Sequence, residues 1–109
     1  MALGHSAPEE LLAFQLRAAG IAHEREVILS ELKPRRWRWD FKIGRLLVEV
    51  QGGTWIGGKH SRGAGYENDC EKVCSATAAG FTVLTVVPKQ VKTGAVLAWI
   101  ETIMRNQAA

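Results

Sequence analysis

The feature that most constrains the fold is an alternating stretch from Arg36 to Gln51, interrupted by Gly44 and Arg45. Before the interruption every second residue is apolar, as in a β-strand with one face against a core: Trp37, Trp39, Phe41 and Ile43. After the interruption, Leu46 to Gln51 predicts a second strand. A two-residue loop with Gly in first place is typical of a type II′ turn. The stretch therefore predicts an antiparallel hairpin with one apolar face.

A two-residue loop also fixes the register of this hairpin. The facing pairs on one side are then all apolar, so the register is self-consistent: Ile43 with Leu46, Phe41 with Val48, and Trp39 with Val50. A slip by one residue would move every one of these side chains to the polar face. A longer loop would change the pairing.

The same register places two acids, Asp40 and Glu49, directly opposite each other. Facing residues have Cβ atoms about 4.5–5.5 Å apart, so the two carboxylates repel. A hard cation between them removes this cost, because Mg²⁺ binds carboxylate oxygens together with water and substrate phosphate. Alternatively, the acids are an exposed pair screened by Arg38 and Lys42. The residues alone leave both interpretations open.

The segments around the hairpin predict an α/β fold. We expect a helix over 7–19 capped by Ser6, a strand over 24–29, a loop over 51–65, a helix over 66–79, a strand over 81–87 and a helix over 95–104. This order predicts a mixed central sheet flanked by helices. The length of 109 residues favours a single domain, over residues 1–109.

Positive charge is concentrated in the hairpin region, although the net charge is only +3. Six cations lie between Lys33 and Arg45 against one acid, a pattern typical of a surface for a phosphate backbone, or of a solvated charged strand. No apolar run of about 18 residues is present, which argues against a membrane partner. The N-terminus lacks a signal-peptide pattern, so we expect a soluble, cytoplasmic protein. Cys70 and Cys74 have no zinc-ligand partners in sequence and are predicted to be small buried residues.

Several segments together resemble a known family. Arg36–Phe41, Leu47–Gly53, His60–Lys72 and Gly80–Leu84 are similar to the PD-(D/E)XK (restriction-endonuclease-like) nuclease superfamily, especially to small phage and bacterial members related to very-short-patch-repair endonucleases. The likeness extends from about Glu9 to Ile103. It implies an αβββαβ core with a mixed sheet, plus a C-terminal helix. It also implies an Mg²⁺-dependent endonuclease, with Mn²⁺ as a substitute, that hydrolyses phosphodiester bonds in DNA.

The resemblance implies specific roles for the acids. Asp40 and Glu49 match the metal-binding, catalytic pair of the superfamily. The motif lysine that usually follows is replaced here by Gln51, whose amide oxygen can bind metal or orient water. Some members carry this lysine on the next helix, where Lys72 is the candidate; the alternative is a surface pair with Asp69. Glu9 matches a metal-binding acid of the first helix, with Glu10 behind it, although Glu9 also fits as the capping partner of Ser6.

Other residues are candidates for binding nucleic acid. These are Arg36, Arg38, Lys59, His60, Arg62 and Trp55. The last four lie in a Gly-rich loop, where His60 is alternatively without function and Trp55 alternatively covers the sheet. Two other functions stay open: a catalytically weak or inactive nucleic-acid-binding module, for which Gln51 is the main argument, and an assembly role as a homodimer. Trp99 is predicted to be either a core residue or a dimer contact.

Overall fold

The structure is a computed structural model that describes residues 6–51 and 63–108. Four of the residues predicted to contact nucleic acid lie outside the described residues: Trp55, Lys59, His60 and Arg62. No helix in the described ranges is long and apolar enough to cross a membrane.

The first helix, α1 (Ala7–Ala18), begins and ends at the predicted signals. The Ser6 hydroxyl oxygen accepts a hydrogen bond of 3.3 Å from the backbone N–H of Glu9, which satisfies one of the free donors at the helix start. The helix ends before Gly20, whose φ of 71° lies in the left-handed region that glycine adopts without strain.

Four strands form one mixed sheet in the order β1-β2-β3-β4. They are β1 (Glu24–Ile28), β2 (Arg38–Ile43), β3 (Leu46–Val50) and β4 (Thr82–Val86). The first three are antiparallel neighbours, whereas β4 runs parallel to β3. The short 3₁₀ helix η1 (Ser30–Leu32) follows β1. The predicted mixed sheet flanked by helices is therefore confirmed.

The hairpin of β2 and β3 has the predicted register next to its turn, but the ladder ends at Phe41 and Val48 and does not include the predicted pair of Trp39 with Val50. Phe41 pairs with Val48, Lys42 with Leu47, and Ile43 with Leu46. Gly44 has a φ of 60°, and Arg45 is not among the residues with positive φ, as a type II′ turn requires.

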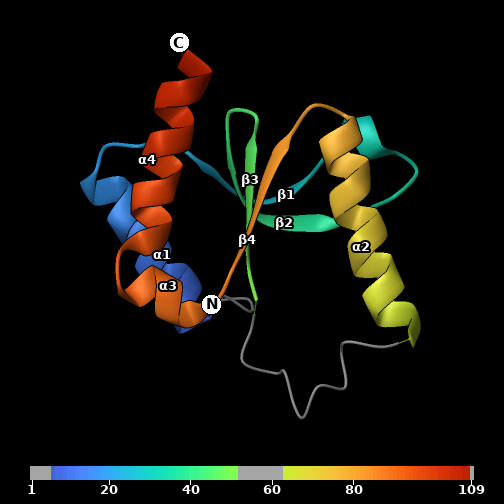
Figure 1. The fold of residues 1–109 in the computed structure, drawn as a ribbon, viewed down its shortest axis with the longest axis horizontal. Coiled ribbons are helices and arrows are strands. Elements are labelled where there is room, and N and C mark those ends of the chain that lie inside the picture. Colours follow the sequence, from blue (N-terminus) through green and yellow to red (C-terminus); the bar gives the residue numbers. More distant parts are fainter. Residues whose placement is uncertain (1–5, 52–62, 109) are drawn as a thin grey trace.

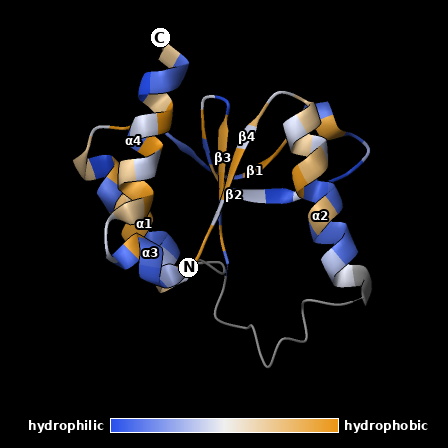
Figure 2. Ribbon diagram, viewed as in Figure 1, coloured by the Kyte–Doolittle hydropathy of each residue, from blue (hydrophilic) through white to orange (hydrophobic). Residues whose placement is uncertain are grey.

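Helices cover both faces of the sheet (Figure 1). On one face lie α1, α3 (Pro88–Lys92) and α4 (Ala95–Ala108); on the other lies α2 (Gly63–Ala78). The core accordingly has two parts. The larger one joins Leu12 and Leu16 of α1 to Phe41, Val48 and other buried strand residues, and the smaller one contains Leu29, Trp39, Leu47, Ala76 and Phe81. In Figure 2 the hydrophobic colour is strong on β3, which lies between the two helix layers.

Trp39 does not lie on the predicted face. It is fully buried, as expected, but it packs with Leu47 under α2 and not with Phe41. The β1–β2 ladder is interrupted next to it, because Glu26 has a φ of 55° and no paired partner between Arg25 and Val27. The pairs on both sides of Glu26 keep the same register, so no residue is inserted, and Trp39 changes face beside this break in the ladder.

Other boundaries also differ from the predictions. The helix α2 begins at Gly63, three residues before the predicted start, and α4 continues to Ala108. The prediction that Cys70 and Cys74 are buried is wrong, since both are exposed. The helix packs against the sheet through residues such as Ala76, and the cysteines lie on its solvent side. Trp99 is also exposed, at 43%, and is not a core residue.

Candidate active site

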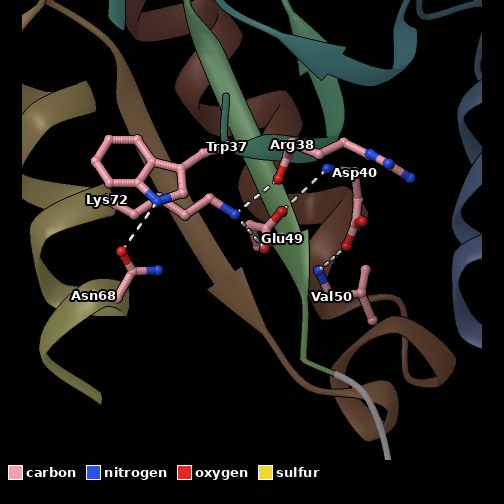
Figure 3. Close-up of polar contacts among 7 residues, drawn as sticks. All are labelled: Trp37, Arg38, Asp40, Glu49, Val50, Asn68 and Lys72. Carbon is pink, nitrogen blue, oxygen red and sulfur yellow. Dashed lines mark hydrogen bonds and ion pairs between the residues drawn. The ribbon is translucent and has the colours of Figure 1, made fainter. Parts of the chain in front are cut away.

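The two predicted acids are joined across the β2–β3 hairpin by their side chains. The backbone N–H of Asp40 donates a hydrogen bond of 3.2 Å to Glu49 Oε2, and the backbone N–H of Val50 donates one of 2.8 Å to Asp40 Oδ2 (Figure 3). These contacts begin where the ladder of backbone pairs ends, beyond Phe41 and Val48. Each carboxylate thus binds the backbone of the opposite strand, and this bond fixes its orientation.

Both carboxyl groups have shifted acidities. Burial raises the pKa of Asp40 above its ordinary value, against the opposing effects of the Val50 hydrogen bond and the charge of Lys72. Burial also raises the pKa of Glu49, again against the opposing charge of Lys72, while the charge of Asp40 raises it further. The charged form of a buried carboxyl group is poorly solvated, so a cation that lies next to it stabilises this form.

Lys72 supplies a cation to this pair from α2. Its Nζ lies 3.1 Å from Glu49 Oε1, and it donates a hydrogen bond of 2.8 Å to the carbonyl oxygen of Arg38. The ammonium also lies 4.4 Å from the centre of the Trp39 ring, at cation–π distance. The side chains of Lys72 and Glu49 are only 14% and 21% exposed. The sequence left the partner of Lys72 open, and the structure brings it to Glu49.

The position of α2 is fixed by further contacts beside this lysine. Trp37 Nε1 donates a hydrogen bond of 3.4 Å to Asn68 Oδ1 (Figure 3), and Arg35 contacts Glu71 at 2.6 Å. Asn68, Glu71 and Lys72 are spaced so that they share one face of the helix. The segment before β2 and the acidic pair are therefore bound by the same helical face.

Glu26 is a residue of the site that the sequence did not predict. It lies on β1 near Asp40, where its negative charge contributes to the raised pKa of Asp40, and its carboxylate binds Arg38 at 2.9 Å. A non-glycine residue at a φ of 55° within a strand is uncommon, and such conformations gather at functional sites. No sequence signal could have found it, because the register of β1 against β2 is set by contacts distant in the chain.

Three other predicted site residues lie on different parts of the fold: Gln51, Arg36 and Glu9. Gln51 follows β3 with an exposed side chain, and its backbone N–H donates to the carbonyl oxygen of Val86 at 2.7 Å. Arg36 is exposed in the segment before β2. Glu9 lies in the first turn of α1. Metal binding by Glu9, catalysis by Gln51 and DNA binding by Arg36 all stay predictions.

The donor set can be compared with the needs of a divalent metal ion. Within residues 6–51 and 63–108, no group of three or more His, Cys, Asp or Glu side chains is arranged to hold a metal. Mg²⁺, however, is ordinarily held by only one or two carboxylates, with water and substrate phosphate completing its shell. Two partly buried carboxylates with fixed orientation therefore fit this ion.

Comparisons with known proteins add one likeness of fold. No protein-family model matches the chain, and a search of curated proteins gives no significant match. Among solved structures, the catalytic domain of the homing endonuclease I-Bth0305I is similar, with a TM-score of 0.73 and 20% sequence identity. The alignment covers 95% of this chain and 99% of that domain. The two chains therefore share a fold over nearly their whole lengths.

Proposed function

We propose that this protein is a metal-dependent endonuclease that hydrolyses phosphodiester bonds in DNA, with Mg²⁺ as its ion and Mn²⁺ as a substitute. The observation that carries the proposal is the pair of partly buried carboxylates, Asp40 and Glu49, fixed across one hairpin with the Lys72 ammonium on Glu49. A structural sheet gains little from two facing acids, whereas a cation site needs them. The shared fold with the catalytic domain of a homing endonuclease supports the same function.

In this proposal Asp40 and Glu49 hold the metal. The ion supplies a Lewis acid that polarises the phosphate and favours deprotonation of the attacking water. The hydrogen bonds from Val50 and Asp40 keep the two carboxylates in a fixed orientation before the substrate binds. Fixed ligands of this kind lower the cost of reorganisation during the reaction.

Lys72 takes the place of the lysine that is missing at Gln51. Its ammonium lies beside Glu49, so it can offset the negative charge that builds up on the phosphate. Gln51 follows β3 directly, and its amide is proposed to orient the attacking water. Removing a preorganised donor from an active site costs about 100-fold or more in rate. We expect Lys72→Met to lower the cleavage rate by about this factor.

DNA is proposed as the substrate because of the resemblance to PD-(D/E)XK nucleases, and cations that can bind its phosphate backbone lie on both sides of the acids in the sequence. Arg36 and Arg38 precede Asp40, while Lys59 and Arg62 follow Glu49, together with His60 and Trp55. Cations of this kind bind the phosphate backbone, and Trp55 is proposed to stack on a base. Glu9 is proposed as an additional metal ligand.

The test is nicking of supercoiled plasmid DNA with and without Mg²⁺. We expect metal-dependent cleavage that Asp40→Asn abolishes while DNA binding is retained. Glu101→Gln is the matched control, because it removes the same charge from an exposed position on α4. Equal cleavage by Asp40→Asn and the wild type would contradict the proposal.

The second candidate function is a DNA-binding module of the same fold with weak or no catalysis. The observation in its favour is Gln51 at the position of the usual lysine. It predicts salt-sensitive DNA binding without cleavage in either Mg²⁺ or Mn²⁺. The same plasmid assay, run beside a binding assay, separates the two functions.

A further inference from the structure

A groove lies at the end of the β1–β2 ladder that is farthest from the turn at Gly44. Its volume is about 380 Å³, and it is lined by Ile28, Leu29, Ser30, Lys33, Pro34, Arg35 and Arg36. Ile28 pairs with Arg38 at this end of the ladder, and Ile28 is 47% exposed although it is a large apolar residue. The groove therefore combines apolar surface with three cations.

The cations of the groove differ in how they are paired. Arg35 binds Glu71 at 2.6 Å and lies over the ring of Trp37. Neither Lys33 nor Arg36 forms an ion pair with any other described residue. By contrast, four other cations of the sheet and of α2 each have a carboxylate partner: Arg25, Arg38, Lys42 and Lys72. The uncompensated positive charge of this region is thus concentrated at the groove.

The groove is connected to the acidic pair in two ways. Arg36 is four residues before Asp40, so an extended chain separates their Cα atoms by at most about 14 Å. The same face of α2 also binds both places, since Glu71 contacts Arg35 and Lys72 contacts Glu49. The groove therefore lies within a few nucleotides' length of the acids.

We infer that the groove is a substrate subsite that binds the DNA strand next to the phosphate that is cut. The inference rests on the proposed nuclease function. Lys33 and Arg36 hold phosphates of this strand, while Ile28 and Pro34 pack against a sugar or base. A nucleotide presents this combination of an anionic phosphate and a flat apolar face, whereas an inorganic anion does not.

The test measures binding of a short labelled DNA duplex to the full chain by fluorescence anisotropy, in metal-free buffer so that no cleavage occurs. Each phosphate contact contributes about 0.9 to the slope of log affinity against log salt concentration. Lys33→Ala with Arg36→Ala is expected to lower the slope by about 1.8. Ile28→Ala is expected to weaken binding several-fold at an unchanged slope, because it removes only an apolar contact.

The matched control is Arg17→Ala with Arg105→Ala, which removes the same two charges. Arg17 is in the last turn of α1, and Arg105 precedes Gln107, which binds Thr82 at the hairpin end of the sheet. This control is expected to keep the wild-type slope. If circular dichroism shows that Lys33→Ala with Arg36→Ala is unfolded, the single variant Arg36→Gln is measured instead. Its slope of log affinity against log salt concentration is expected to fall by about 0.9.

Two results would overturn the inference. One is an unchanged slope in the folded groove variant, Lys33→Ala with Arg36→Ala, and the other is an equal fall of the slope in the control. Tighter binding of an RNA duplex, with the same dependence on Lys33 and Arg36, would overturn the assignment to DNA. Failure of the nuclease proposal has a different signature. In that case plasmid DNA stays intact in Mg²⁺, while the groove variant still shows the lower slope of log affinity against log salt concentration.

Discussion

Replacing Lys72 with Met removes an ammonium that lies 3.1 Å from Glu49 Oε1 and donates 2.8 Å to the carbonyl of Arg38. Met keeps a straight side chain of good helix propensity, so the change concerns mainly the charge. Hydrogen bonds to charged groups contribute about 1.5–3 kcal/mol, whereas exposed ion pairs contribute about 0.2–1 kcal/mol. Because the two side chains are only 14% and 21% exposed, we expect a coupling energy of about 1.5 kcal/mol.

The assay is urea unfolding of the wild type, Lys72→Met, Glu49→Gln and the double variant. Arg35→Met with Glu71→Gln forms the matched cycle, since that pair has a shorter contact of 2.6 Å but is 48% and 51% exposed. Its coupling energy is expected to stay below about 1 kcal/mol. The comparison separates the effect of burial on the coupling energy from the effect of the distance between the charged atoms.

The coupling must also depend on pH in a definite direction. The Lys72 charge favours the ionised form of Glu49 and lowers its pKa, although burial makes the net shift upward. The Lys72–Glu49 interaction is therefore present above the pKa of Glu49 and lost as the pH falls through it. A Lys72–Glu49 coupling no larger than that of Arg35–Glu71, or one that stays constant into acid, would refute the reasoning.

Three further predictions concern the same hairpin. Asp40→Asn is expected to raise stability at pH 7, and this advantage is expected to disappear in acid. Burial raises the folded-state pKa of Asp40, so ionisation of the carboxyl group costs stability as the pH rises through that value. Thermal unfolding of both proteins from pH 3 to 8 measures the difference, and equal curves would contradict the prediction. Mn²⁺ at about 100 times its dissociation constant is expected to stabilise the wild type by about 2.7 kcal/mol and to stabilise Glu49→Gln far less. Thermal-shift measurements test this, and equal shifts would argue against Glu49 as a metal ligand. Gly44→Ala is expected to lower the free energy of unfolding by about 1 kcal/mol, as measured in urea. The φ of 60° is strained for alanine, although the added Cβ would meet no other atom. An unchanged free energy of unfolding would count against the assigned turn.

Much of the hairpin could be predicted because its determinants are local. The period-two pattern, the two-residue turn and the apolar pairs all lie within one short stretch, and together they predict that Asp40 and Glu49 lie close together, as their hydrogen bonds to the opposite strand show. The capping signals of α1 are equally local, so its ends were predicted within one residue.

The remaining features depend on contacts between distant segments. The positive φ of Glu26 and the face occupied by Trp39 both depend on how β1 joins β2. The exposure of Cys70 and Cys74 depends on which side of α2 meets the sheet, and the sequence of a weakly amphipathic helix does not determine this. Lys72 could be proposed only as an alternative, because its partner Glu49 is brought to it by the fold.

The hydrogen bonds between each acid and the opposite strand make two backbone amides into reporters of the site. The N–H of Asp40 contacts Glu49, and the N–H of Val50 contacts Asp40, so each amide proton senses the charge of one carboxylate. In a ¹⁵N-labelled sample, these two resonances are expected to move as the carboxylates titrate or bind a diamagnetic ion such as Mg²⁺. Occupancy of the centre can thus be followed atom by atom, without substrate and without turnover.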